Sequence, residues 1–339
     1  MQNERIHWID IAKGIGIIFI IYAHELGSHD LRYLFYSFHI PLFLFLSGIV
    51  FKPYSNFFKF LKKCVNGLLI PYLLIAFASY VIWAINFTNF SFTGNEEIKQ
   101  FLSIFYGNSN NGLMDFNNIL WFLPTLFITR IMFYFLHKFV TKTSKLVLSL
   151  FLISIIGYVY SIYVNLKLPF GTETAISALV FYGSGYLWFN NEKAKTVIYN
   201  FRKILFPSLL IIGIIISTIE FNNYGQQIDM RLLHLNNYFS FYFDAYAGII
   251  AWISFSLILN KNNILEYLGK NSLVLFSWHF ILFNYFDKFR DIFFSKNFIQ
   301  SIKIILPTLY AASSILIILS INNLYYKLLF KMFPKPQTK

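Results

Sequence analysis

The first apolar stretch of the chain contains three ionisable side chains, Asp10, Lys13 and His24. Ionisable groups are costly inside a membrane, and those that occur there often mark functional sites. Lys13 and His24 are eleven residues apart, and at about 100° per residue this spacing brings both to one face of a helix, roughly 16 Å apart along the axis. Such a face presents a cation near one end and an imidazole near the other. This arrangement suits a substrate with an anionic tail and a distant reacting group.

Each of these residues also has a purely structural explanation. Lys13 could extend to the lipid headgroups and pair with Asp10 one turn earlier. His24 could be an interfacial histidine that is hydrogen-bonded to a neighbouring helix. Residue type and spacing alone leave both interpretations open.

The elements that must position these residues are hydrophobic helices. Of the 339 residues, 57% are hydrophobic and only 13% are charged, about half the share expected of a soluble domain. A membrane-crossing helix needs about 20 mostly apolar residues. Ten stretches qualify: 8–26, 34–51, 67–86, 118–137, 146–164, 174–189, 204–220, 239–259, 272–286 and 304–326. We therefore expect an all-α integral membrane fold, a bundle of about ten transmembrane helices.

The basic residues indicate the orientation of this bundle. With the N-terminus inside and ten spans, 18 Lys and Arg residues fall in inside segments and eight in outside segments, with Lys13 and Arg130 within spans. Because positive residues concentrate on the cytoplasmic side, both termini are expected in the cytoplasm. The segment 287–303 fits this assignment least well, since it holds four of the eight outside charges.

Composition also excludes several classes of protein. The net charge of +13 is spread over short loops, which indicates attraction to anionic lipid and not nucleic-acid binding. The single cysteine, Cys64, leaves no pair for a disulfide and no cysteine metal site. No cleavable signal peptide is expected before the first span. Residues 1–339 are expected to form a single membrane-embedded domain, with polar outside loops at 87–117 and 221–238.

Four sequence blocks resemble the membrane-bound acyltransferase-3 family, and they occur in the family's order. Lys13-x10-His24 resembles the Arg/Lys-x10-His signature of its first span, and the residues around it look like the fucose 4-O-acetylase-like branch. The blocks in this chain are WIDIAKGIG at 8–16, FHIPLFLFLSG at 38–48, LWFLP at 120–124 and LGKNSL at 268–273, with His279 following. From the first block to the last, the resemblance extends over nearly the whole chain.

The resemblance implies transfer of an acyl group, usually acetyl, from cytoplasmic acyl-CoA to a hydroxyl of a cell-surface polysaccharide or lipid-linked glycan. The expected location is the cytoplasmic membrane of a bacterial cell, as a multi-pass protein among lipid. Acetyl-CoA is then a donor substrate and no permanently bound cofactor is expected. Imidazole titrates in the range needed to deprotonate a hydroxyl, so His24 is expected to be the general base. A covalent acetyl-histidine is the alternative. The oligomeric state stays open, with a homodimer as one option.

Other candidate residues follow from the same resemblance. Lys13 keeps the charge of the more usual arginine but loses its bidentate fork, and is assigned to acyl-CoA contact or site organisation. His39 is assigned to positioning His24 or the donor, or else to a hydrogen bond across helices. Arg130 should meet a donor phosphate or a carboxylate, for which Asp244 is the structural alternative. His279 could cap the pocket but is expected to pack, and Ser47-Gly48 is expected to bring helices close together.

The cytoplasmic basic residues could bind the CoA phosphates or simply anchor the chain; they are Lys59, Lys62, Lys63, Arg202 and Lys203. No glycine-rich phosphate loop and no metal-ligand spacing is present, so no metal is expected. Two further functions remain open. One is a transporter or exporter of a glycan or polar solute, which proline- and glycine-interrupted spans also fit. The other is passage of an acyl group across the membrane to a separate transferase.

Overall fold

The computed structural model describes residues 6–26, 30–87, 95–164 and 166–332. The two chain ends, and with them the predicted positions of the termini, lie outside these ranges, as does part of the predicted loop 87–117. Within them the chain is helical, with one isolated antiparallel bridge between Asp229 and His234. The elements are α1 (His7–Glu25), α2 (Asp30–Ile49), α3 (Phe57–Cys64), η1 (Val65–Leu69), α4 (Ile70–Phe87), α5 (Asn95–Tyr106), η2 (Asn118–Trp121), α6 (Phe122–Phe139), α7 (Thr143–Tyr163), η3 (Pro169–Gly171), α8 (Thr172–Phe189), α9 (Glu192–Tyr224), α10 (Tyr238–Leu259), α11 (Asn263–Lys270), α12 (Ser272–Phe293), α13 (Lys296–Ile302) and α14 (Leu306–Met332).

All ten predicted stretches are helical, but they differ in how apolar they are. Among the described residues, six helical segments are long and apolar enough to cross a membrane: Phe57–Asn86, Asn118–Phe139, Thr143–Tyr163, Glu192–Tyr224, Tyr238–Leu259 and Leu306–Leu324. The other four predicted spans correspond to α1, α2, α8 and α12. The helical class and the membrane-type helices are confirmed, whereas the count of ten spans stays a prediction.

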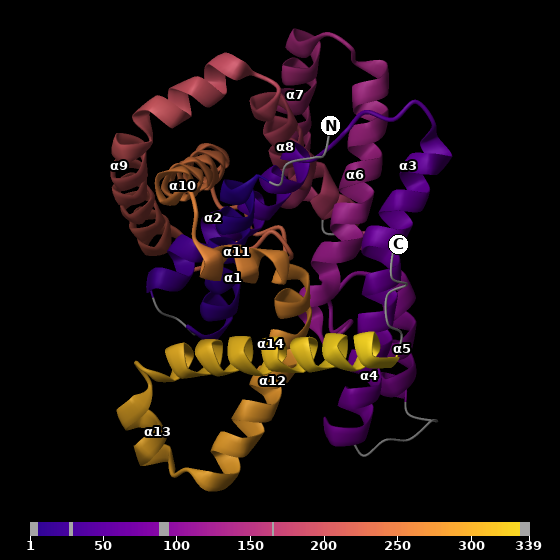
Figure 1. Ribbon diagram of the computed structural model, residues 1–339, viewed down its shortest axis with the longest axis vertical. Coiled ribbons are helices and arrows are strands. Elements are labelled where there is room, and N and C mark those ends of the chain that lie inside the picture. The colour runs from indigo at the N-terminus through magenta and orange to yellow at the C-terminus, as the bar shows by residue number, and fades with distance from the viewer. Residues whose placement is uncertain (1–5, 27–29, 88–94, 165, 333–339) are drawn as a thin grey trace.

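Two of the less apolar helices, α1 and α8, lie inside the bundle, and two of the most apolar ones, α7 and α9, lie at its margin. Only 17% of the apolar window of α9 and 22% of that of α7 is buried, and Figure 1 shows both helices at the periphery. By contrast, most of α1 and α8 is buried. A helix surrounded by protein can hold polar side chains that lipid would penalise. This explains why α1 can carry the charged and imidazole groups.

Glycines bring the interior helices into backbone contact. A Cβ on Gly14 of α1 would clash with the carbonyl oxygen of Leu265, and one on Gly269 of α11 would clash with that of Asp10. Gly48 of α2 meets the Tyr182 carbonyl of α8 in the same way. Small residues permit this close approach of membrane helices. The prediction that Ser47-Gly48 serves helix packing is thereby confirmed for Gly48.

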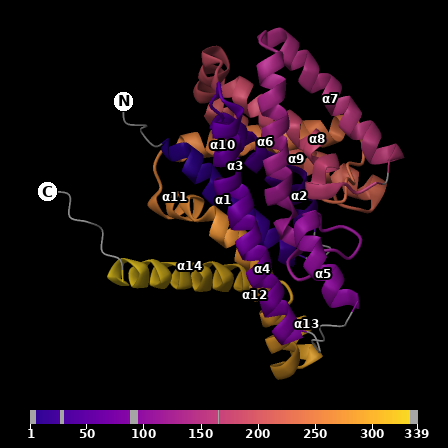
Figure 2. The ribbon, with the colours of Figure 1, turned by 90° about the vertical axis from the view of Figure 1, so that its right-hand side faces the viewer.

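The C-terminal helices wrap one side of the bundle. α12 packs against both α14 and α1, and α14 lies crosswise to α4 in Figure 1 and again in the view turned by 90° in Figure 2. The short helix α11 packs along α1. Through α11 and α12, the C-terminal part of the chain encloses both ends of α1.

Candidate functional site

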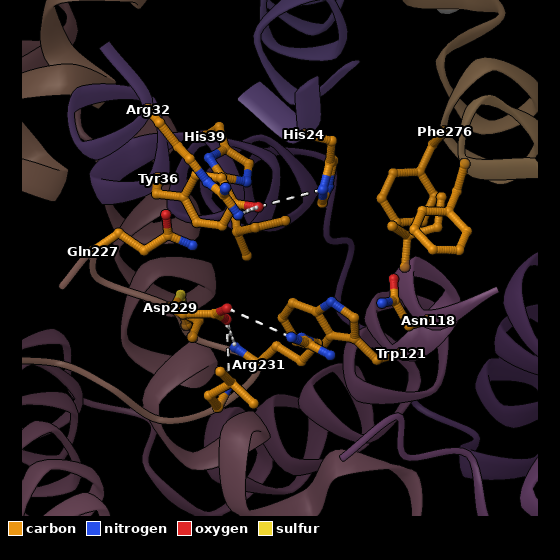
Figure 3. Close-up of a pocket in the computed structure, with 15 residues that line it drawn as sticks. His24, Arg32, Tyr36, His39, Asn118, Trp121, Gln227, Asp229, Arg231 and Phe276 are labelled. Carbon is orange, nitrogen blue, oxygen red and sulfur yellow. Dashed lines mark hydrogen bonds and ion pairs between the residues drawn. The ribbon is translucent and has the colours of Figure 1, made fainter. Parts of the chain in front are cut away.

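A cavity of about 380 Å³ lies at the C-terminal end of α1 and contains His24 in its wall. Five segments far apart in the sequence line it: the end of α1, the first half of α2, η2, the loop between α9 and α10, and α12. Figure 3 shows His24, Tyr36 and Arg32 on one side of the cavity, with Asp229 and Arg231 across from them. Its volume is in the range of small-molecule binding sites.

His24 is oriented by a tyrosine of the neighbouring helix. The hydroxyl of Tyr36 lies 3.3 Å from Nδ1 of His24, and Arg32 donates to the same hydroxyl oxygen at 3.4 Å. A guanidinium can only donate, so the oxygen of Tyr36 accepts from Arg32 and its O–H is available to donate to His24. In this arrangement the lone pair of His24 is on Nδ1 and faces Tyr36.

Two more histidines approach this pair. His39 lines the cavity, its Nδ1 bonds the Phe35 carbonyl at 2.5 Å, and its ring centroid lies 4.9 Å from that of Tyr36. The His279 ring centroid lies 5.3 Å from that of His24, and its Nδ1 bonds the Leu275 carbonyl at 3.1 Å. Because a carbonyl only accepts, both Nδ1 atoms carry hydrogen. The buried Nε2 of His279 has no hydrogen-bond partner in the described structure.

The ring of His279 thus packs beside that of His24, and one of its nitrogens is buried without a partner among the described residues. The structure brings together three histidines from α1, α2 and α12: His24 and His39 contact Tyr36, and His279 contacts His24.

Lys13 lines two further cavities, at the other end of α1. One is narrow, about 230 Å³, and mostly apolar, with Ile20, Phe43 and Leu126 in its wall. The other is about 800 Å³ and also has Asp10, Lys52 and Lys63 in its wall.

The three cavities follow one another along α1. Lys13 lines both the large and the narrow cavity. Ile40 and Phe276 line both the narrow cavity and the one that contains His24. Each cavity therefore shares side chains of its wall with the next. We call them, in order, the lysine cavity, the narrow cavity and the histidine cavity.

Arg130 lines none of these three cavities. Its guanidinium lies 5.9 Å from the ring centroid of Phe60, between α6 and α3, and its buried Nε has no hydrogen-bond partner in the described structure. The alternative ion pair with Asp244 is wrong: Asp244 accepts a hydrogen bond from Ser217 at 2.9 Å, at the interface of α10 with α9. A donor contact of Arg130 stays a prediction.

Of the basic residues considered for the CoA phosphates, Lys63 alone borders the lysine cavity. Its Nζ donates to the hydroxyl of Tyr54 at 2.9 Å. Lys52, which the sequence reasoning counted only as a topology signal, lies in the same wall.

The sequence reasoning missed the far wall of the histidine cavity, formed by Gln227, Asp229, Met230, Arg231 and Leu232. It described 221–238 only as a polar outside loop. One signal was present, because apolar and charged residues alternate from Ile228 to Leu232, which is typical of a segment with one buried face.

The comparisons with known proteins agree with the sequence blocks. The acyltransferase-3 model, described as an acyltransferase domain, matches residues 6–322. No curated protein and no solved structure matches the chain. The match covers every helix that borders the three cavities. Together with the six strongly apolar helices among the described residues, it indicates a multi-pass membrane protein. The chain belongs to the acyltransferase-3 family.

Proposed function

We propose that the protein transfers an acetyl or similar acyl group from cytoplasmic acyl-CoA to a hydroxyl of a cell-surface polysaccharide or lipid-linked glycan. The observation that carries this proposal is the series of three cavities along α1, which runs from Lys13 to His24. It supplies a basic compartment, a thin apolar passage and a polar compartment with an imidazole. These are the environments that the parts of acyl-CoA and a hydroxylic acceptor need.

The donor binds with its phosphates in the lysine cavity. Lys13, Lys52 and Lys63 all border that cavity, and ammonium groups attract phosphate as compact positive charges. The uncharged pantetheine arm is long and thin, and it extends through the narrow cavity, whose wall is largely apolar. The thioester then reaches the histidine cavity from the side of Ile40 and Phe276.

In the histidine cavity, His24 takes the proton of the acceptor hydroxyl at Nδ1, directly or through Tyr36, as the hydroxyl oxygen attacks the thioester carbonyl. The carbon–sulfur bond breaks, the acetyl ester forms, and the CoA thiolate takes the proton back from the imidazolium. An alternative sequence forms acetyl-His24 first and then passes the acetyl group to the hydroxyl. In that route the CoA thiolate leaves as Nδ1 is acetylated; when the hydroxyl then attacks, the carbon–nitrogen bond breaks and the hydroxyl proton passes to the thiolate.

The test uses membrane vesicles that contain the protein, radiolabelled acetyl-CoA and extracted cell glycan. We expect the parent to label the glycan and His24→Ala to lose about 10²- to 10⁴-fold in rate, the usual contribution of a general base. His234→Ala is the matched control, because His234 is an exposed histidine that lies outside the three cavities. Equal labelling by the parent and His24→Ala would exclude His24 from the chemistry. Absence of labelling by the parent, with a donor and acceptor of known quality, would favour a transporter.

A further inference from the structure

The loop between α9 and α10 is a packed part of the protein. Gly225, at φ +63°, ends α9, as glycine commonly does at this position. Asp229 and His234 then exchange two backbone hydrogen bonds of 2.9 and 3.0 Å, which close a tight turn. Ile228 and Met230 within it are at most 4% exposed. A loop buried to this degree has a fixed shape.

Three consecutive backbone carbonyls of this loop accept hydrogen bonds from side chains of distant segments. Thr174 donates to Met230 at 3.3 Å, Asn110 to Arg231 at 3.0 Å, and Lys167 to Leu232 at 3.1 Å. Burial lowers the pKa of Lys167, which reflects how closely the protein encloses this ammonium. The backbone is therefore fixed on one side of the loop, while the side chains of Gln227, Asp229 and Arg231 face the histidine cavity on the other. We call these three residues the loop wall.

The carboxylate of Asp229 is set in a defined orientation. Its Oδ1 accepts hydrogen bonds from the backbone N–H groups of Arg231 and Leu232, at 2.8 and 3.3 Å. Its Oδ2 has a longer contact, 3.8 Å, with the guanidinium of Arg231. An ionised carboxylate has about four acceptor positions, so Asp229 keeps acceptor capacity for hydrogens that enter the cavity.

The rest of the cavity complements this carboxylate. Gln227 and Asn118 offer amides that both donate and accept, Arg231 offers donors, and Trp121 offers an aromatic surface. Hydroxyl groups pair with such planar polar side chains, and the C–H face of a sugar ring packs on an aromatic ring. The lysines that are proposed to bind the phosphates of the donor lie at the other end of α1. The histidine cavity is thus suited to a hydroxyl-rich ring.

We propose that the loop wall binds the acceptor saccharide and selects which of its hydroxyls faces His24. Asp229 accepts hydrogen bonds from sugar hydroxyls, Gln227 and Arg231 fix the ring beside it, and His24 and Tyr36 lie across the cavity. This assignment rests on the proposed acyltransferase function for its purpose, but it concerns binding and can be measured without any transfer.

The experiment measures equilibrium binding to the purified full chain in detergent. The probes are a tritium-labelled oligosaccharide released from the envelope glycan of the source cells and, separately, labelled acetyl-CoA. We expect Asp229→Asn to weaken oligosaccharide binding about 10-fold or more and Gln227→Ala about 3- to 10-fold, as loss of a charged and of a neutral hydrogen-bonding group predicts. Acetyl-CoA binding should stay within about 2-fold in both.

Gln226→Ala is the matched control, because Gln226 is the same residue type one position earlier and is exposed outside the cavity wall. It should bind both probes like the parent. If Asp229→Asn does not give monodisperse protein, Gln227→Ala against Gln226→Ala decides the question alone. Equal oligosaccharide binding by these variants and the parent overturns the inference, as does a parent that does not bind the oligosaccharide. A parallel loss of both probes also overturns it, because that pattern reports general damage. A parent that binds the oligosaccharide but transfers no acetyl group contradicts the proposed function. It does not contradict the assignment of saccharide binding to the loop wall.

Discussion

The two ends of α1 differ in how their cavities are built. At the Lys13 end the cavity is about 800 Å³, and its wall holds three lysines, Lys13, Lys52 and Lys63, together with Asp10. At the His24 end the cavity is about 380 Å³; hydrogen bonds link His24, Tyr36 and Arg32, and Asp229 is fixed by the backbone of the α9–α10 loop. Charge attraction tolerates loose geometry, whereas proton transfer requires groups placed within hydrogen-bond reach. Under the proposed function, this difference assigns donor binding to the first end and chemistry to the second.

Lys13 provides the larger expected effect with which to test this difference. Lys13→Ala should raise the KM for acetyl-CoA about 10- to 100-fold, since it removes a charged contact to phosphate, and should change kcat much less. Lys13→Arg should retain most of the affinity because the charge remains. Initial rates at varied acetyl-CoA concentration measure both parameters, with the exposed Lys59→Ala as control. A loss confined to kcat would place Lys13 in the chemistry. It would contradict the assignment of binding to one end of α1 and chemistry to the other.

Substitution of Tyr36 should give a smaller effect, and on kcat instead of the KM for acetyl-CoA. Tyr36→Phe removes the hydroxyl between Arg32 and His24 and leaves the ring. The loss of one neutral hydrogen bond predicts a decrease in kcat of about 3- to 10-fold, with the KM for acetyl-CoA unchanged. The measurement is the same rate series, and Tyr33→Phe on the same helix is the control. An increase in KM alone would show that Tyr36 binds the donor.

The smallest expected effect concerns α11, which supports the Lys13 end. Nδ1 of His7 lies 2.9 Å from Oε2 of Glu266, and Lys270 lies 3.5 Å from the same oxygen. The hydrogen bond from His7 and the nearby charges hold the pKa of Glu266 below its usual range. A lowered carboxyl pKa stabilises the fold above the unfolded-state pKa, and this stabilisation is lost as the pH falls through the lower folded-state value.

Thermal unfolding in detergent between pH 6 and pH 3 tests this expectation. The parent should lose stability as the pH falls below the usual glutamate range, and Glu266→Gln should lose less over the same interval. The rate of acetyl transfer at neutral pH should be close to that of the parent. Identical pH profiles for the two proteins would contradict a role of this carboxylate in stability.

The features that could be predicted from the sequence are those that follow from helical periodicity. Lys13 and His24 share a helix, so their spacing alone places them along one face, and the ten apolar stretches coincide with helices because burial in lipid or protein requires that pattern. Contacts between distant segments carry no such signal. Arg231 approaches Ser109 across 122 positions, and no local pattern predicts that the loop wall would face His24. Arg130 shows the same limit, because its charge indicated a buried partner but not which helix would supply it.

The partition between the histidine cavity and the narrow cavity has a consequence for the cell. Ile40 and Phe276 border both spaces, so two apolar side chains stand between a polar compartment on one side and a passage towards the lysines on the other. A bilayer maintains ion and proton gradients only while no continuous file of water crosses it. In the proposed function, the slender uncharged arm of the donor passes these two side chains, whereas their apolar surfaces disfavour a continuous file of water.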